Sequence, residues 1–186
     1  MLSNHKMRCF ISIDISKEIQ EQIIKIQNCL PEFVGKKIES ENLHLTLKFL
    51  GEISEDKVEE VKKRLERIKC KEFEAEIDKL GIFDNRKSIK HPSKIVVWLH
   101  IKGVKELQSL IDKTLEDLFR VEKRFMSHLT IARVKKVKDK EKFLEELNKI
   151  KFDKMKFQVN NFTFKQSTLT TKGSIYKNLE KYNLKS

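Results

Sequence analysis

Two short stretches of the sequence each place a threonine two residues after a histidine. His44 and Thr46 form the first pair, and His128 and Thr130 form the second, 84 residues further along the chain. Imidazole titrates near neutral pH, so a histidine can either donate or accept a proton. One histidine as acid and another as base would supply the two proton transfers needed to break a phosphodiester. The threonine hydroxyls would bind its non-bridging oxygens.

Both pairs lie in stretches that alternate in the manner of a β-strand. A leucine separates histidine from threonine in each pair, and aliphatic residues follow. Because successive side chains of a strand point to opposite faces, each histidine shares a face with its threonine. One such pair alone is usually structural, but two copies with the same companions favour catalysis. We therefore predict motif strands near residues 43–50 and 127–134.

Two basic residues beside these pairs are weaker candidates for contact with a phosphate. Strict alternation puts Lys48 on the face of the first pair and Phe49 on the opposite face. It also puts Arg133 on the face opposite His128. A bulge or a strand end would change these assignments, and surface charge is the alternative role for both basic residues.

The remaining chemistry-bearing residues do not predict a second site. We exclude His5 as part of the N-terminus, His91 as a loop residue before a proline, and His100 for lack of a threonine two residues on. The three cysteines have no metal-ligand spacing, and Cys9 is expected to be a small buried hydrophobe. Carboxylate clusters and glycine-rich phosphate loops are absent from the sequence, so we expect no metal and no cofactor.

Alternating strands and helices are predicted around the motifs. Strands are expected over residues 7–15, 73–80, 95–101 and 157–164. Helices are expected after Ser16, after Ser54, from Val104 to about Leu118, and around residues 143–147. Gly51 is expected to end the first motif strand.

The two halves of the chain resemble each other in the order of these elements. Each half offers a strand, a helix, and a motif strand followed by another helix. We interpret residues 1–186 as a single two-lobed unit with an internal duplication, in which both motif strands face a shared cleft. A chain of 186 residues is long enough for such a core, and no linker rich in Pro, Gly or Ser divides it.

The composition favours a cytoplasmic protein with a polyanionic partner. Hydrophobic residues make up 39% of the chain and charged residues 37%, and the formal net charge is +12. No apolar run approaches the roughly 18 residues that span a bilayer, and the N-terminus lacks a signal-peptide core. The positive charge favours RNA or DNA over membranes, although a solvated Lys/Glu surface typical of heat-stable proteins explains it equally well.

The residues around the two pairs resemble the signatures of the RNA 2′,3′-cyclic phosphodiesterases. These enzymes, historically called 2′-5′ RNA ligases, belong to the two-histidine phosphoesterase superfamily. The matching residues are 41–52 and 125–134, with further matches at 8–13, Gln166, Ser167, Leu169, Gly173 and Tyr176. The resemblance covers nearly the whole chain. Ser127 departs from the family, which commonly has proline there, and this affects the start of the second strand rather than the proton chemistry.

The resemblance implies an α+β fold with two pseudo-symmetric lobes, each an antiparallel sheet flanked by helices, around a central cleft. It implies metal-free hydrolysis of RNA 2′,3′-cyclic phosphate ends to 2′-phosphate. His44 would be the proton donor to the leaving 3′ oxygen, and His128 the proton acceptor that activates water. Thr46 and Thr130 would bind the phosphate, with Arg133 as a weaker member of the site.

The expected partner is RNA with a 2′,3′-cyclic phosphate end, with tRNA fragments among the candidates, bound by a monomer without membrane association. The reverse reaction, 2′-5′ RNA ligation, would use the same residues and is the first alternative. A non-catalytic RNA-end-binding module is the second, favoured by the charge of +12. The third is a hydrolase of cyclic nucleotides or 2′-5′ oligoadenylate.

Overall fold

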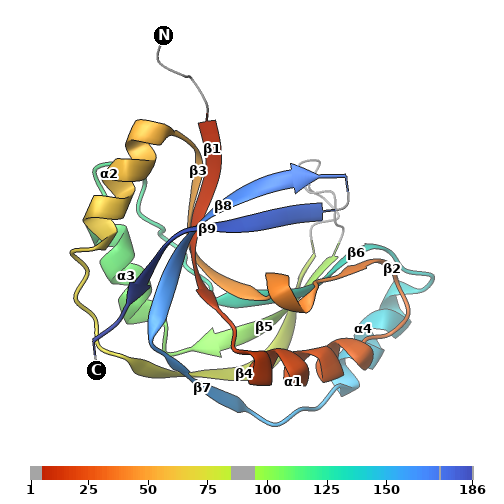
Figure 1. Ribbon diagram of the computed structural model, residues 1–186. Helices are drawn as coiled ribbons and strands as arrows, with labels where there is room; N and C mark the ends of the chain where they lie inside the picture. The colour runs from red at the N-terminus through yellow and green to blue at the C-terminus, as the bar shows by residue number, and fades with distance from the viewer. Residues whose placement is uncertain (1–5, 85–94, 172, 186) are drawn as a thin grey trace.

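The computed structural model describes residues 6–84, 95–171 and 173–185, which form strands and helices (Figure 1). The strands are β1 (Lys6–Asp14), β2 (Val34–Lys37), β3 (His44–Ser54), β4 (Phe73–Asp84), β5 (Ile95–Lys102), β6 (His128–Lys136), β7 (Met155–Val159), β8 (Asn161–Thr170) and β9 (Gly173–Asn183). The helices are α1 (Lys17–Asn28), α2 (Glu55–Leu65), α3 (Lys105–Thr114) and α4 (Lys140–Lys149), with a 3-10 turn, η1, at Ser40–Asn42. His5 and His91, which the sequence analysis excluded, lie outside the described residues.

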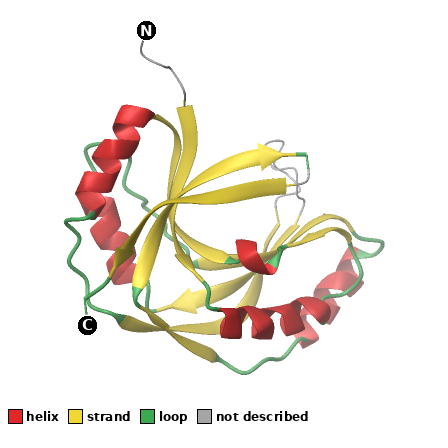
Figure 2. Ribbon diagram, in the orientation of Figure 1, coloured by secondary structure: helices red, strands yellow, loops and turns green. Residues whose placement is uncertain are grey.

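Two antiparallel sheets form the centre of the molecule, and helices cover their outer sides (Figure 2). One sheet has four strands in the order β3-β1-β8-β9, and the other has five in the order β2-β6-β5-β4-β7. Helices α2 and α3 pack against β3, whereas α1 packs against β6. The predicted α+β fold with two antiparallel sheets is confirmed. Among the described residues, no helix is both long and apolar enough to span a membrane.

The two sheets do not correspond to the two halves of the chain. The four-stranded sheet combines β1 and β3 with β8 and β9, while β2 joins the edge of the five-stranded sheet beside β6. Each sheet nevertheless contains one motif strand, β3 or β6. In both cases the motif strand pairs with an earlier strand, and a helix lies between the two strands in the sequence. Thus β1 pairs with β3, and β5 pairs with β6.

Helix α1 illustrates how the sequence pattern produces these elements. The Ser16 hydroxyl accepts a hydrogen bond from the Ile19 amide at 3.5 Å, which caps the helix at its first turn. Ile19, Ile23 and Ile26 recur at helical spacing and are buried in the core. The predicted N-terminus of this helix is confirmed.

Two strand predictions differ from the structure, and two strands were missed. Strand β3 continues through Gly51, whose φ of 74° accommodates an irregular step in the pairing with β1, and ends at Ser54. The single strand predicted over residues 157–164 is two strands, because β7 pairs with β4 in one sheet and β8 pairs with β1 in the other. Strand β2 and the long strand β9 were not predicted.

Candidate active site

The two motif histidines begin their strands and are held by identical hydrogen bonds. His44 Nδ1 lies 2.8 Å from the carbonyl oxygen of Asn42, and His128 Nδ1 lies 2.8 Å from that of Met126. Because a carbonyl only accepts, Nδ1 must carry the proton in both rings. Each imidazole is therefore oriented by the residue two positions before it. The Nε2 atom of each ring is left to donate or accept a proton.

The threonines share the faces of their histidines, as alternation predicts. His44, Thr46, His128 and Thr130 are half-buried, whereas the residues between and directly after them, Leu45, Leu47, Leu129 and Ile131, are fully buried in the core. The strands β3 and β6 contact each other although they belong to different sheets. The fold therefore brings the two motifs into one neighbourhood.

Beyond the threonines, both motif strands contain a bulge at the same place. Leu47 has no register partner in β1, and Ile131, 84 residues later, has none in β5. A bulge adds one residue to one strand and so reverses the alternation that follows. Phe49 consequently lies on the same face of β3 as His44, and Arg133 lies on the same face of β6 as His128. Strict alternation had placed both residues on the opposite faces.

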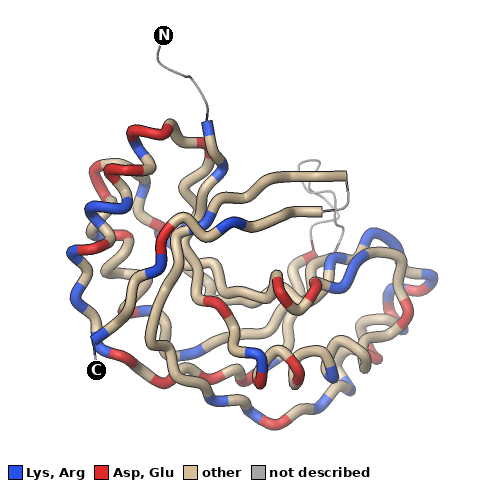
Figure 3. The backbone as a smooth tube through the Cα atoms, in the orientation of Figure 1, with Lys and Arg blue, Asp and Glu red and all other residues tan. Residues whose placement is uncertain are grey.

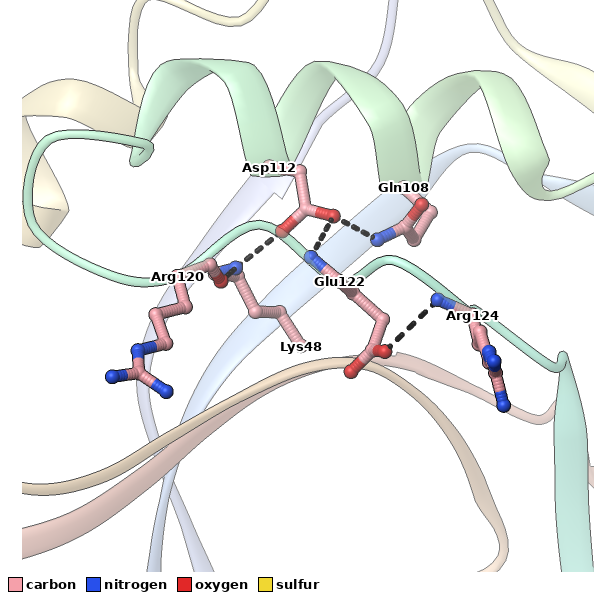
Figure 4. Close-up of polar contacts among 6 residues, drawn as sticks. All are labelled: Lys48, Gln108, Asp112, Arg120, Glu122 and Arg124. Atoms are coloured by element: carbon pink, nitrogen blue, oxygen red, sulfur yellow. Dashed lines mark hydrogen bonds and ion pairs between the residues drawn. The ribbon is translucent and has the colours of Figure 1, made fainter.

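Lys48 lies on the opposite side of β3 from the predicted one and does not face a phosphate site. Its ammonium forms a buried ion pair with Asp112 of α3 and donates a hydrogen bond to the Arg120 carbonyl at 2.8 Å (Figure 4). Asp112 also accepts hydrogen bonds from the Gln108 side chain at 2.6 Å and from the Glu122 amide at 3.0 Å. The predicted face of Lys48 is therefore wrong, because the bulge turns this side chain inward to tie β3 to α3.

Arg133 also lies on the opposite face from the predicted one, and this strengthens its candidacy. The side chain is exposed and lies close enough to both imidazoles for its positive charge to lower the pKa of each. One guanidinium charge therefore influences both motif histidines. Guanidinium is well suited to this position because it binds phosphate oxygens through paired hydrogen bonds.

Burial is the main electrostatic influence on the two histidines. It lowers the pKa of His44 from 6.5 to about 4, opposed by the Asn42 hydrogen bond and by Asp14, and reinforced by the charges of Lys165 and Arg133. Burial also lowers the pKa of His128, opposed by the Met126 hydrogen bond and reinforced by Arg133. Both rings are thus neutral at pH 7 when no substrate anion is bound.

Two aromatic rings lie beside each histidine and contribute to its burial. The His44 ring centroid lies 5.0 Å from those of Phe10 and Tyr176, and the Tyr176 ring meets it edge-on at 85°. The His128 centroid lies 4.9 Å from that of Phe83, at 83°, and 6.5 Å from that of Trp98. Sequence analysis matched Tyr176 to the family but missed Phe83 and Trp98. Their role depends on strand pairing, which brings Trp98 opposite Thr130.

The sequence analysis excluded His100 as a site residue, but His100 lies directly opposite His128 in the β5–β6 pair. Residues opposite each other in an antiparallel pair share a face, so this ring flanks the site. Its Nδ1 lies 2.7 Å from a carboxylate oxygen of Asp78, which also pairs with Lys102 at 2.8 Å. The corresponding neighbour of His44 in β1 is Asp14. The surroundings of the two motif histidines therefore differ.

Metal-ligand clusters do not appear in the part of the chain that the structure describes. No group of three His, Cys, Asp or Glu side chains gathers there in a way that could hold a metal ion. Cys9 is 1% exposed, and burial raises the pKa of its thiol to about 11. This agrees with its prediction as a buried hydrophobe.

Comparison with known proteins places this arrangement in a family. The family model described as LigT like Phosphoesterase matches residues 13–92 and 100–176. An RNA 2′,3′-cyclic phosphodiesterase of Archaeoglobus fulgidus is 36% identical over 179 residues, covering 93% of this chain and 98% of the relative. The enzyme of the same name from Methanocaldococcus jannaschii is 34% identical over 183 residues, covering 95% and 100%.

Solved structures agree with this placement at the level of the fold. A crystal structure of Escherichia coli LigT complexed with 3′-AMP superimposes with a TM-score of 0.77 at 24% identity, covering 98% of this chain and 100% of that one. The family model and the relatives from Archaeoglobus fulgidus and Methanocaldococcus jannaschii show that the chain is an enzyme of the phosphoesterase class, as predicted. It belongs to the LigT-like phosphoesterase family.

Proposed function

We propose that this protein hydrolyses the 2′,3′-cyclic phosphate at the end of an RNA and leaves a 2′-phosphate. The observation that carries the proposal is the matched fixation of two imidazoles, His44 through Asn42 and His128 through Met126. Both rings keep Nε2 for proton transfer and lie near Arg133. The relatives from Archaeoglobus fulgidus and Methanocaldococcus jannaschii carry the name of this activity.

In the proposed reaction the two histidines have opposite roles. His128, neutral in the free protein, accepts a proton from water through Nε2 as the water oxygen attacks phosphorus. His44, protonated in the substrate complex, donates a proton from Nε2 to the 3′ oxygen as the bond between this oxygen and phosphorus breaks. The products are a 3′-hydroxyl and a 2′-phosphate. Proton exchange with solvent then restores both rings.

The charge that develops on the non-bridging oxygens needs nearby donors. Thr46 and Thr130 each present a hydroxyl on the face of a motif histidine, and the Arg133 guanidinium adds a positive charge. Donors fixed by strands do not need to reorganise during the reaction, which is why such contacts contribute strongly to catalysis. These three side chains are the proposed phosphate-binding set.

The body of the RNA is proposed to follow the paired strands β2 and β6. Exposed basic residues gather on these two strands next to Arg133 (Figure 3). They are Lys36, Lys37, Lys135 and Lys136. Cations along one edge of the site would bind the phosphate backbone of RNA, tRNA fragments included, in a salt-dependent manner. Residues 1–186 act in this proposal as one two-lobed unit and as a monomer.

The direct test is turnover of an RNA oligonucleotide that bears a 2′,3′-cyclic phosphate, measured in the presence of a metal chelator. We expect a 2′-phosphate product, and formation of a 3′-phosphate or no turnover would overturn the proposal. His44→Ala and His128→Ala should each lower the rate by about 10²- to 10⁴-fold while the RNA still binds. Full activity in either variant would exclude the two-histidine mechanism.

The same assay addresses the reverse reaction. Ligation would use His44 and His128 in the same roles: His128 accepts the proton of the attacking 5′-hydroxyl of a second RNA in place of water, and His44 donates a proton to the leaving 3′ oxygen. Adding an RNA with a 5′-hydroxyl end and measuring the 2′-5′ joined product against the hydrolysed one gives the equilibrium between them. A protein that binds cyclic-phosphate ends without any turnover would instead be an RNA-end-binding module.

A further inference from the structure

The surroundings of His44 include a pocket that the near-symmetry of the motifs does not predict. The pocket has a volume of about 550 Å³ and lies between the turn η1, the end of β1 and the strands β8 and β9. In Figure 1, η1 is the short orange turn below the β8–β9 hairpin. The side chains used below are Asp14, Glu41, Asn42, Lys165, Tyr176 and Asn178. A volume of this size falls within the range of small-molecule sites.

The pocket adjoins the catalytic centre through two shared residues. Asn42, which lines the pocket, provides the carbonyl that holds His44 Nδ1 at 2.8 Å. Tyr176, which also lines it, meets the His44 ring edge-on with centroids 5.0 Å apart. A molecule in the pocket would therefore lie beside His44.

The charges in the pocket disfavour a phosphate. Asp14 and Glu41 are both carboxylates, and the single ammonium among the lining residues, Lys165, already pairs with Asp14 at 2.7 Å. The Lys165 side chain is only 9% exposed, so little of its charge is available to an anion. Carboxylate and amide oxygens instead accept hydrogen bonds from hydroxyl and amino groups, which a ribose and a nucleobase carry.

The chemistry of a cyclic phosphate fixes where the terminal nucleoside lies relative to the general acid. The leaving oxygen is attached to the ribose of the terminal nucleoside, so this nucleoside must lie on the side of the general acid. Water arrives from the opposite side of phosphorus. We infer that the pocket binds the terminal nucleoside of the RNA, with Tyr176 as the aromatic surface for its base. This inference rests on the proposed function and adds the position of the nucleoside to it.

The inference also provides a physical reason for the roles of the histidines. The two motifs themselves are almost interchangeable, since each ring is held by the same hydrogen bond and followed by the same threonine. The pocket removes this ambiguity, because the nucleoside carries the oxygen that needs a proton. His44, next to the pocket, is then the proton donor, and His128 is the acceptor.

The test compares two RNA ends that differ only in the terminal base. One substrate carries a normal terminal nucleoside with a 2′,3′-cyclic phosphate, and the other carries the same cyclic phosphate on an abasic ribose. The wild-type protein should prefer the base-bearing end in kcat/KM by about 5- to 150-fold, the range for stacking of a base on an aromatic ring. Tyr176→Ala should abolish most of this preference, and Tyr176→Phe should retain it.

Phe83→Leu is the matched control variant. Phe83 meets the His128 ring at 4.9 Å and 83°, almost as Tyr176 meets His44, but does not line the pocket. Its loss should change kcat/KM for the two substrates by the same factor. Asn178→Ala, at a second residue of the pocket lining, should raise KM for the base-bearing end alone.

The outcomes separate the pocket from the proposed function. If Tyr176→Ala turned over both ends with an unchanged preference for the base-bearing end, the assignment of the pocket to the nucleoside would be overturned. The cyclic phosphodiesterase activity would remain in place. An equal loss of kcat/KM on both RNA ends in Tyr176→Ala would show that Tyr176 acts only through His44. This result would also overturn the assignment of the pocket to the terminal nucleoside. Failure of every variant and of the wild type to open either end would overturn the proposed function itself.

Discussion

Arg133 lies on the same face of β6 as His128, although the two residues are five positions apart in one strand. The bulge at Ile131 makes this possible, and an equivalent bulge at Leu47 turns Phe49 outward in β3. The guanidinium reaches a position from which its charge lowers the pKa of His128 and of His44. A bulge is therefore part of how the site is built.

Removing the charge of Arg133 should impair catalysis and shift both histidines. We expect Arg133→Gln to lower kcat/KM by about 10²- to 10³-fold, as loss of a transition-state donor does, and Arg133→Lys to recover part of it. Because a nearby cation disfavours imidazolium, the substitution should raise the pKa of both rings, which NMR titration can measure. Unchanged pKa values with unchanged activity would place the guanidinium away from the site.

The pH dependence should differ between the free protein and the substrate complex. The profile of kcat/KM reports the free protein, in which the pKa of His44 is about 4 and that of His128 lies below 6.5. Its maximum should therefore lie between about pH 4 and 6.5. A bound phosphate anion raises the pKa of both rings, so the maximum of kcat should lie at higher pH. A kcat/KM maximum above pH 7 would contradict this electrostatic picture.

The hydroxyls of the two threonines can be tested without altering side-chain shape. Thr46→Val and Thr130→Val should each lower kcat by about tenfold or more, because each loses a donor to the transition state. Thr46→Ser and Thr130→Ser keep the hydroxyl and serve as the controls. A loss of kcat in the serine variant but not in the valine variant would show that packing of the methyl group, and not hydrogen bonding, is what the threonine contributes.

Lys48 should matter for stability, because its partner is buried. Lys48→Met leaves the Asp112 carboxylate without its cation, and we expect the free energy of unfolding to fall by about 3–5 kcal/mol. The double variant Lys48→Met/Asp112→Leu should recover most of this loss. The exposed pair Lys138–Glu32, 3.5 Å apart, provides the control, since Lys138→Met should change stability by less than about 1 kcal/mol. Denaturant unfolding measures the free energy of unfolding of these three variants.

The parts of the site that depend on local pattern could be predicted from the sequence. Alternation alone places His44 with Thr46 and His128 with Thr130, and the Ser16 cap and the buried isoleucines of α1 follow from spacing. The faces of Lys48 and Arg133 could not be predicted, because a bulge depends on how the partner strand pairs. The same limit applies to Phe83 and to the pocket beside Tyr176, which strands from distant parts of the chain create.

Strand β2 escaped prediction for a related reason. Its four residues, Val34–Lys37, are all exposed and include a glycine, so they lack the apolar alternation that marks a strand. They are ordered by pairing with β6, where Gly35 allows close approach: a Cβ there would lie 2.2 Å from the Arg133 carbonyl oxygen. This edge of the sheet could be predicted only with knowledge of the tertiary structure.

The order of strands in the four-stranded sheet has a consequence for biosynthesis. Strand β1 lies between β3 and β8, so Arg8 pairs with Ser167, and β9 is added only through β8. Pairing between the two ends of a chain is slow to form, and the ribosome releases the C-terminal end last. A nascent chain that already contains both histidines therefore still lacks the strands that carry Lys165 and Tyr176. Synthesis of β8 and β9, rather than synthesis of the motifs, should therefore mark the onset of activity.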